Sequence, residues 1–309
     1  MNTFRFGLQQ SNWESLAQLR DFSTRAEDLG YSSICAADHF DDQWAPLISA
    51  TAIAASTQSI NVGTLVLAND YRHPVVLAKE IATLDQLSGG RVELGIGAGW
   101  MATDYESSGI SHDRPGVRVD RLAESVTVLK GLFSDEPVTF SGEHYRLDAQ
   151  RGTPQPVQRP HPKIHIGGGA RRILELAGRE ADIIGINFDM RAGAISPDLG
   201  PNGTADATLE KLAWVRAGAG DRFDSLELSV TVFFAMVTDD RSAMATMMAG
   251  GFQLEPQTLL ASPHVLLGTT DEMIDTLQAR REQFGFTYIV VPGAQLDAFA
   301  PVVAALAGQ

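Results

Sequence analysis

The chain is poor in cysteine, in basic residues and in long apolar runs. Its one cysteine, Cys35, lies in an apolar segment, which excludes an internal disulfide and predicts a buried, unreactive thiol in a reducing cytoplasm. The 24 basic residues against 38 acidic ones give a formal net charge of −14, which argues against nucleic acid or an anionic membrane as a partner. No segment approaches the length of a membrane span, and residues 1–6 lack the order of a secretion signal. We therefore expect a cytoplasmic protein that acts on a small molecule.

Apolar, β-branched segments alternate with amphipathic helical segments along the whole chain. Strands are predicted at 4–9, 33–37, 61–67, 92–97, 163–167, 182–186, 228–235 and 287–291, and helices at 15–29, 46–56, 74–87, 118–132, 171–178, 209–217 and 270–284. About eight such units predict an α/β fold in which a parallel sheet closes into a (β/α)8 TIM barrel. An open, doubly wound sheet is disfavoured because its glycine motif follows the first strand. We expect residues 1–309 to form a single domain.

Insertion segments interrupt this alternation. Residues 137–148 alternate apolar and polar side chains around Ser141-Gly142, which predicts a β-hairpin, and the proline-rich residues 152–162 predict irregular chain. Together they predict an insertion over about 135–162. Residues 190–202 are rich in Gly, Pro, Ser and Asp, which predicts a mobile loop over about 188–204, at the barrel end where substrate-binding loops lie.

A strand that ends at Gly167-Gly168-Gly169 runs directly into a helix that begins near Arg171. Glycines allow close approach of the backbone to a ligand, and the free amides and dipole of a helix N-terminus favour a phosphate. Arg171 and Arg172 are placed to add positive charge. The motif predicts a phosphorylated cofactor or substrate, and the alternative is a tight turn that binds nothing.

The carboxyl ends of barrel strands are where functional groups gather. Here they carry no Ser–His–acid triad, no paired carboxylates and no metal-ligand spacing, so we expect neither a hydrolase nor a metal site. His39 is able to move a proton near neutral pH, with a structural hydrogen bond as the alternative. Asp38 precedes it, but neighbouring strand residues point to opposite faces, so we do not expect a dyad. Glycines, aromatics and one titratable group suit a redox cofactor that carries the reactive centre itself.

Several sequence blocks, in order, resemble the luciferase-like monooxygenase superfamily, and especially its actinobacterial F420-dependent oxidoreductases. These blocks are 26–31, 38–40, 71–80, 88–100, 116–122 and 166–169. The resemblance implies a luciferase-like TIM barrel that holds coenzyme F420, or alternatively FMN, with its phosphate on Gly167–Ala170. It also implies a non-prolyl cis peptide at Leu65-Val66 behind the cofactor ring, and it makes His39 the proton donor or acceptor.

The strand ends and the resemblance together predict a set of site residues. Those expected to bind the cofactor are Asp38, Leu65, Val66, Asn69, Gly97, Gly99, Gly167, Gly168, Gly169, Ala170 and Arg171. Those expected to line the substrate pocket are Gln10, Trp13, Trp44, Trp100 and Asn187. Trp100 stands where the resemblance places a glutamate in the sugar-phosphate dehydrogenases, so a flat or apolar substrate is expected.

The function implied by the resemblance depends on the cofactor. With F420, a hydride would pass between reduced deazaflavin and a small apolar or aromatic organic substrate. With FMN, reduced flavin would react with oxygen and insert one oxygen atom into the substrate. A flavin- or deazaflavin-binding protein without turnover is a further alternative, because a single titratable histidine is weak support for catalysis. The resemblance also implies a homodimer that pairs through residues 48–55 and 74–87.

Overall fold

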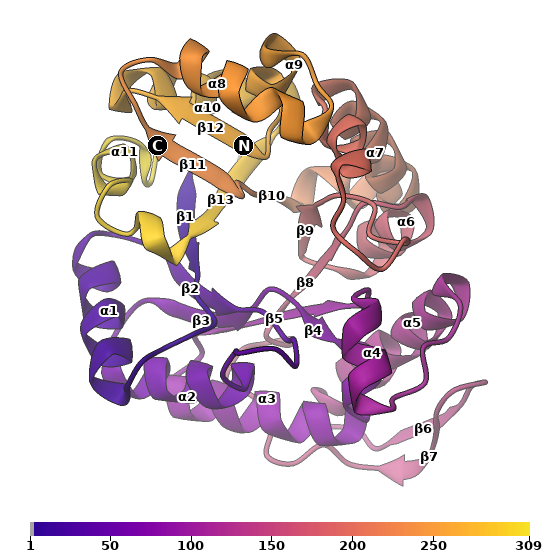
Figure 1. Cartoon of the computed structure of the whole chain (residues 1–309). Helices are drawn as coiled ribbons and strands as arrows, with labels where there is room; N and C mark the ends of the chain where they lie inside the picture. Colours follow the sequence, from indigo (N-terminus) through magenta and orange to yellow (C-terminus); the bar gives the residue numbers. More distant parts are fainter. Residues whose placement is uncertain (1–2) are drawn as a thin grey trace.

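Parallel strands close into a barrel in the computed structural model, which describes residues 3–309 (Figure 1). The strands pair in the order β3-β2-β1-β13-β10-β9-β8-β5-β4, and a further pairing of β3 with β5 closes the circle. Their bounds are β1 (Arg5–Gln9), β2 (Ser33–Ala36), β3 (Asn61–Thr64), β4 (Leu67–Ala68), β5 (Val92–Gly97), β8 (Lys163–Gly168), β9 (Ile183–Ile186), β10 (Glu227–Thr231) and β13 (Phe286–Pro292). The predicted TIM barrel is confirmed.

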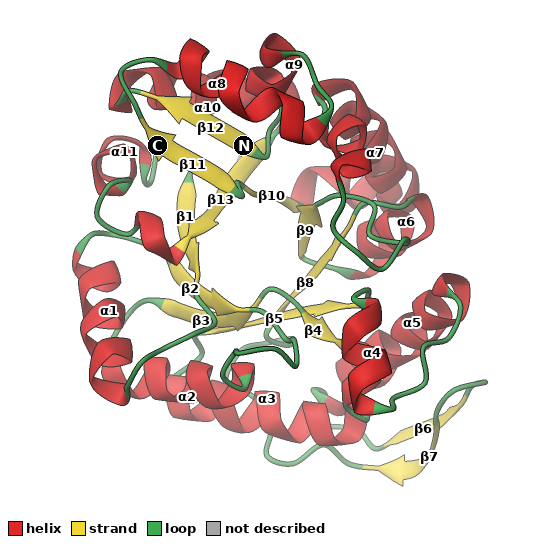
Figure 2. Ribbon diagram, in the orientation of Figure 1, coloured by secondary structure: helices red, strands yellow, loops and turns green. Residues whose placement is uncertain are grey.

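Helices surround the barrel, as Figure 2 shows. They are α1 (Leu16–Asp28), α2 (Pro46–Ser56), α3 (Pro74–Ser88), α4 (Ala102–Ser108), α5 (Pro115–Leu132), α6 (Arg171–Glu180), α7 (Ala205–Ala219), α10 (Thr270–Phe284) and α11 (Ala300–Leu306). Proline opens α2, α3 and α5, where its missing N–H would have no helical partner. A reciprocal capping box between Thr269 and Glu272 begins α10.

The predicted hairpin is confirmed: β6 (Val138–Ser141) pairs antiparallel with β7 (Arg146–Gln150). Glu124 on α5 anchors its turn, since this carboxylate accepts the backbone N–H groups of Glu143, His144 and Tyr145. Residues 152–162 contain no helix or strand, as expected.

The structure differs from prediction at two strands. The predicted strand 61–67 is divided into β3 and β4, and the peptide bond between Leu65 and Val66 at this break is cis, as the resemblance implied. The predicted strand 228–235 is two strands. β10 stays in the barrel, whereas β11 (Phe234–Val237) leaves it and pairs in parallel with β12 (Val265–Gly268).

Residues 234–268 therefore form a further insertion, which the sequence reading missed. It contains β11, α8 (Arg241–Ala249), α9 (Pro256–Ala261) and β12. These helices span only 9 and 6 residues, too few turns for a 3.6-residue period to stand out. In Figure 1 the insertion covers one side of the barrel mouth.

A buried polar network closes the amino ends of the strands. Arg5 donates to Glu93 at 2.6 Å and to Glu227 at 2.5 Å, and its guanidinium lies 3.5 Å from the ring centre of Tyr288. The Tyr288 hydroxyl contacts Cys35, and burial raises the pKa of that thiol to about 12. The predicted burial of Cys35 is confirmed, and the raised pKa is consistent with an unreactive thiol.

We expect His165, buried inside the barrel, to make stability fall in acid. Burial, with a smaller contribution from Arg5, lowers its pKa from 6.5 to about 3. The unfolded chain therefore binds a proton more readily, so stability is complete above pH 6.5 and is lost as pH falls toward 3. Between pH 7 and pH 5 we expect His165 to account for about 2 kcal/mol of lost stability. In His165→Gln, the difference between urea-unfolding free energies at these two pH values should shrink by that amount; an unchanged difference would contradict the assignment.

Candidate active site

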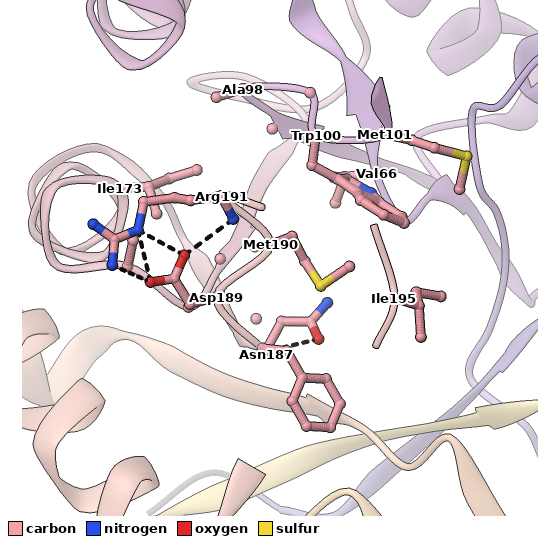
Figure 3. Close-up of a pocket in the computed structure, with 18 of the residues that line it drawn as sticks. Val66, Ala98, Trp100, Met101, Ile173, Asn187, Asp189, Met190, Arg191 and Ile195 are labelled. Atoms are coloured by element: carbon pink, nitrogen blue, oxygen red, sulfur yellow. Dashed lines mark hydrogen bonds and ion pairs between the residues drawn. The ribbon is translucent and has the colours of Figure 1, made fainter. Parts of the chain in front are cut away.

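A cavity of about 860 Å³ opens at the carboxyl ends of the barrel strands. Its wall is formed by strand ends, by the first turns of α5 and α6, and by the connections that follow β9 and β10. Figure 3 shows part of this wall. The volume lies in the upper range of cofactor and ligand sites.

One corner of the cavity is built from the glycines that end β8. Gly167, Gly168 and Gly169 all line it, and a Cβ atom at Gly169 would collide with the backbone of Phe188. Ala170, the N-cap of α6, offers no side-chain cap to the first amides of that helix. The corner therefore presents uncapped N–H groups at the positive end of a helix dipole, which fits the phosphate of a cofactor.

A cation that sequence reasoning missed also lines the cavity. Arg118, in the first turn of α5, lines the cavity although its residue is only 3% exposed. Its Nη1 donates to the Asp113 carbonyl at 2.6 Å, and its Nε is buried with no hydrogen-bond partner among the described residues. A positive charge in the first turn of a helix is unfavourable for the helix dipole. This unusual position was the one feature of the sequence that could have identified Arg118.

The arginines named from the sequence are differently placed. Arg171 lines the cavity but is largely exposed and pairs with Glu175 at 2.7 Å. Arg172 likewise pairs with Asp120 at 2.5 Å. Exposed ion pairs of this kind contribute little free energy. Of these three arginines, Arg118 is the one with a buried donor that lacks a partner among the described residues.

His39 lines the cavity beyond β2, and a buried carboxylate fixes its orientation. Its Nδ1 lies 2.7 Å from Oδ2 of Asp104, on α4, so Nδ1 donates and Nε2 is left as the free nitrogen. Asp104 also accepts the Tyr71 hydroxyl at 3.1 Å and the Phe40 N–H at 3.2 Å. The ring of His39 packs edge-on against Trp100, with 5.5 Å between centroids. The pair forms the acid–base geometry in which a carboxylate selects the histidine tautomer.

Asp38 is not the partner of His39, as the alternation of strand side chains predicted. Its carboxylate accepts both terminal nitrogens of Arg72, at 2.5 and 3.1 Å, and the Ala68 N–H at 3.1 Å. These bonds tie β2 to the short β4, directly beside the cis peptide. Asp38 thus supports the cavity wall, because its carboxylate oxygens are occupied by hydrogen bonds to Arg72 and Ala68.

Residues around the β3–β4 break form an apolar surface in the cavity. Leu65 and Val66 line it together with Gly97 and Gly99 of the next strand end. A Cβ atom at Gly97 would lie 2.9 Å from a Val66 methyl, so glycine keeps this surface shallow. Such a surface suits the face of a flat ring.

Most residues predicted for the site do line the cavity, which brings together His39, Asp38, Leu65, Val66, Trp100, Asn187, both Gly97 and Gly99, and residues 167–171. The structure does not bring Gln10, Trp13, Trp44 or Asn69 to its wall. Gln9 lines it instead of Gln10, because successive strand residues alternate in direction.

The remaining predicted residues are occupied elsewhere. Trp13 is buried edge-on against Phe22, with 5.2 Å between centroids, and Trp44 packs against the barrel core. The Asn69 amide donates to the Tyr145 hydroxyl at 3.2 Å and lines a separate, smaller cavity. Trp13, Trp44 and Asn69 lie in connecting segments beyond the strand ends. Their positions depend on how each connection folds, which cannot be predicted from where the strands end.

A further part of the cavity wall, which begins beside the glycines at Phe188, is apolar and was not predicted residue by residue. It is formed by Phe188, Met190, Ile195, Leu199, Phe233, Phe234 and Phe252. In Figure 3, Met190 and Ile195 lie across the cavity from Val66 and Trp100. The charged pair on this wall, Asp189 and Arg191, is joined at 2.6 Å.

A family model supports the resemblance directly: residues 2–284 match the model for luciferase-like monooxygenases. The chain belongs to this family. The luciferase-like chain is 33% identical over 249 residues to F420-dependent glucose-6-phosphate dehydrogenase from Nakamurella multipartita, covering 78% of the chain and 70% of the relative. It is 30% identical over 182 residues to FMNH2-dependent dimethylsulfone monooxygenase from Pseudomonas putida, covering 56% and 49%. The alignments span about half the length of most of these curated relatives.

Solved structures confirm the luciferase-like fold. The F420-dependent tetrahydromethanopterin reductase from Methanopyrus kandleri superposes with a TM-score of 0.79 at 17% identity, over 99% of both chains. An F420-dependent secondary alcohol dehydrogenase gives 0.75 at 19% identity, over 99% of this chain and 98% of the other. Within residues 3–309 of this luciferase-like protein, no helix has the length and apolar character to span a membrane, and no cluster of side chains is arranged to hold a metal ion.

Proposed function

We propose that this luciferase-like protein is an oxidoreductase that binds coenzyme F420 and transfers a hydride between it and a small apolar or aromatic substrate. The observation that carries the proposal is one cavity with an anion corner at Gly167–Ala170 and Arg118, an apolar surface at Leu65-Val66, and the His39–Asp104 pair. Relatives named as F420-dependent dehydrogenases support the choice of cofactor.

When bound, the deazaflavin would supply hydride-transfer chemistry at a ring carbon. The amides of Gly167–Ala170, together with Arg118, would hold its phosphate, and Leu65 and Val66 would provide an apolar surface for its ring. His39 Nε2 supplies a proton to the substrate heteroatom when the substrate is reduced, or removes it in the reverse direction, so hydride and proton together make a two-electron step. Asp104 keeps the His39 ring in the tautomer that this transfer needs.

The charges of the cavity favour an uncharged substrate. Among the cavity-lining arginines of the described chain, Arg171, Arg172 and Arg191 are each paired with a carboxylate, and Arg118 is assigned to the cofactor. That leaves no cation for a second phosphate, which argues against a sugar phosphate. The wall formed by Phe188, Met190, Ile195 and the aromatic residues of the insertion favours an apolar or aromatic molecule.

The second candidate is an FMN-dependent monooxygenase, because the same anion corner accommodates the FMN phosphate and one relative is FMNH2-dependent. Separate titrations with F420 and FMN, followed by ring fluorescence, test both. We expect saturable binding of F420 that is tighter than that of FMN. Binding of FMN alone would favour the monooxygenase, and binding of neither would overturn the redox function. Binding of F420 with no turnover of any carbonyl, imine or enone would leave the non-catalytic alternative.

We also propose a cytoplasmic, single-domain homodimer. Ile48 is 70% exposed on α2, while Val76 and Leu87 are 52% and 65% exposed on the adjacent α3. Exposed apolar side chains on neighbouring helices form a surface suited to a two-fold interface. Light scattering should give twice the 33.2 kDa of one chain, and a mass of 33.2 kDa would contradict the proposal.

A further inference from the structure

Residues 188–203, which connect β9 to α7, form a wall of the cavity that adjoins the glycine corner at Phe188 and the backbone of Trp100 at Gly193. Phe188, Met190, Ile195 and Leu199 line the cavity, yet regular structure in this segment is limited to the 3-10 turn at 197–203. One backbone bond fixes its middle, where the Gly193 carbonyl accepts the Ala102 N–H at 3.0 Å. Its two ends are held by side chains from outside the segment, including Ser262, whose hydroxyl donates to the Gly203 carbonyl at 2.6 Å.

Both ends of this segment are held by one buried amine. Lys211 on α7 is 1% exposed, and its Nζ donates to the carbonyl of Asn187 at 2.8 Å, at the carboxyl end of β9. The same Nζ donates to the carbonyl and to the side-chain oxygen of Asn202, at 2.6 and 2.9 Å. All three ammonium protons are thus used by neutral oxygens at the two ends of the wall.

Asn202 closes the arrangement. Its side-chain oxygen, which accepts from Lys211, also accepts the Asp189 N–H at 2.6 Å. The beginning and the end of the segment are therefore joined both directly and through the ammonium group. Burial lowers the pKa of Lys211 to about 8, because the charged amine loses its hydration. Its three hydrogen bonds offset this desolvation penalty.

We propose that Lys211 is a positioning residue: by joining Asn187 to Asn202 it fixes residues 188–203 as a wall of the cavity, and so determines how tightly the substrate binds. Lys211 does not itself line the cavity, so it acts only through the segment. The near end of the segment adjoins the anion corner, since the Asn187 N–H donates to the Gly168 carbonyl at 2.9 Å, whereas the rest of that corner is formed by the first turns of α5 and α6. The kinetic part of this proposal rests on the proposed function, whereas the structural part does not.

Hydrogen–deuterium exchange without substrate tests the structural part. Lys211→Met keeps the length of the side chain and removes its donors, and the matched control is Glu210→Gln, an exposed neighbour on α7. In the methionine variant, the amides of Asp189, Gly193 and Leu199 should exchange at least about tenfold faster. The hairpin at 138–150, away from α7 in Figure 1, should be unchanged in both variants. Unchanged exchange in residues 188–203 would overturn the proposal.

Asn202→Ala removes the same link from the loop side and serves if Lys211→Met does not fold. With an active substrate in hand, both variants should raise KM about tenfold while kcat stays within about twofold, since the reacting groups are untouched. An equal loss in kcat, or accelerated exchange with an unchanged KM, would overturn the link to substrate binding. If the protein proves to have no redox activity, the proposed function fails, and the exchange result still decides whether Lys211 holds the wall.

Discussion

Replacing His39 with alanine should lower kcat about 100- to 10,000-fold and leave the Kd of the cofactor nearly unchanged. The reason is that a positioned general acid or base contributes rate acceleration of this size, whereas the cofactor is held mainly at the anion corner. Single-turnover kinetics and fluorescence titration measure the two quantities separately. Should the Kd collapse while turnover persists, His39 would be a contact of the ligand and not the group that moves the proton.

Asp104→Asn provides the companion variant. An asparagine amide is able to donate to Nδ1 of His39, which favours the opposite tautomer and takes away the free acceptor at Nε2. We expect kcat to fall by at least about tenfold, with unchanged binding of the cofactor. Asp41→Asn is the matched control, because Asp41 is an exposed aspartate on the loop that carries His39. Equal activity of the two aspartate variants would show that Asp104 does not orient His39.

The second large effect is expected at Arg118. Arg118→Met should weaken binding of F420 about 10- to 100-fold, because a charge-assisted hydrogen bond contributes roughly 1.5–3 kcal/mol. Fluorescence titration measures the change. The control is Arg171→Met, which should bind F420 almost as the parent does, since Arg171 is exposed and already paired with Glu175.

The same experiment with a cofactor fragment separates a phosphate contact from general damage to the cavity. A deazaflavin ring system without its phosphate arm should bind the parent and Arg118→Met equally well. If both ligands lose affinity to the same extent, Arg118 supports the fold of the corner and does not contact the phosphate.

Local patterns in the sequence were sufficient for the barrel and for one corner of the site. Continuous apolar strands between amphipathic helices predicted the parallel barrel, and Gly167–Gly169 before a helix marked the anion corner, because both signals lie within a few consecutive residues. The cis peptide at Leu65-Val66 came from the resemblance, and no local pattern reveals it.

Residue pairs that come together only in the folded chain could not be predicted from the sequence. His39 and Asp104 are 65 positions apart, and the contact depends on how α4 crosses the barrel rim. The free nitrogen of Arg118 is visible only once the burial of its neighbours is known. The insertion at 234–268 was missed because the apolar run from β10 continues into β11 without a break, although the chain changes sheets between them.

The cavity draws its two sides from different parts of the chain. The anion corner belongs to the barrel frame, at β8 and the first turns of α5 and α6, whereas the apolar wall comes from connections that lie outside the frame, after β9 and β10. Substitutions in those connections are expected to change which substrate is accepted more than they change the anion corner. The barrel frame is therefore compatible with many different substrates, because the residues that would select them lie on exchangeable loops.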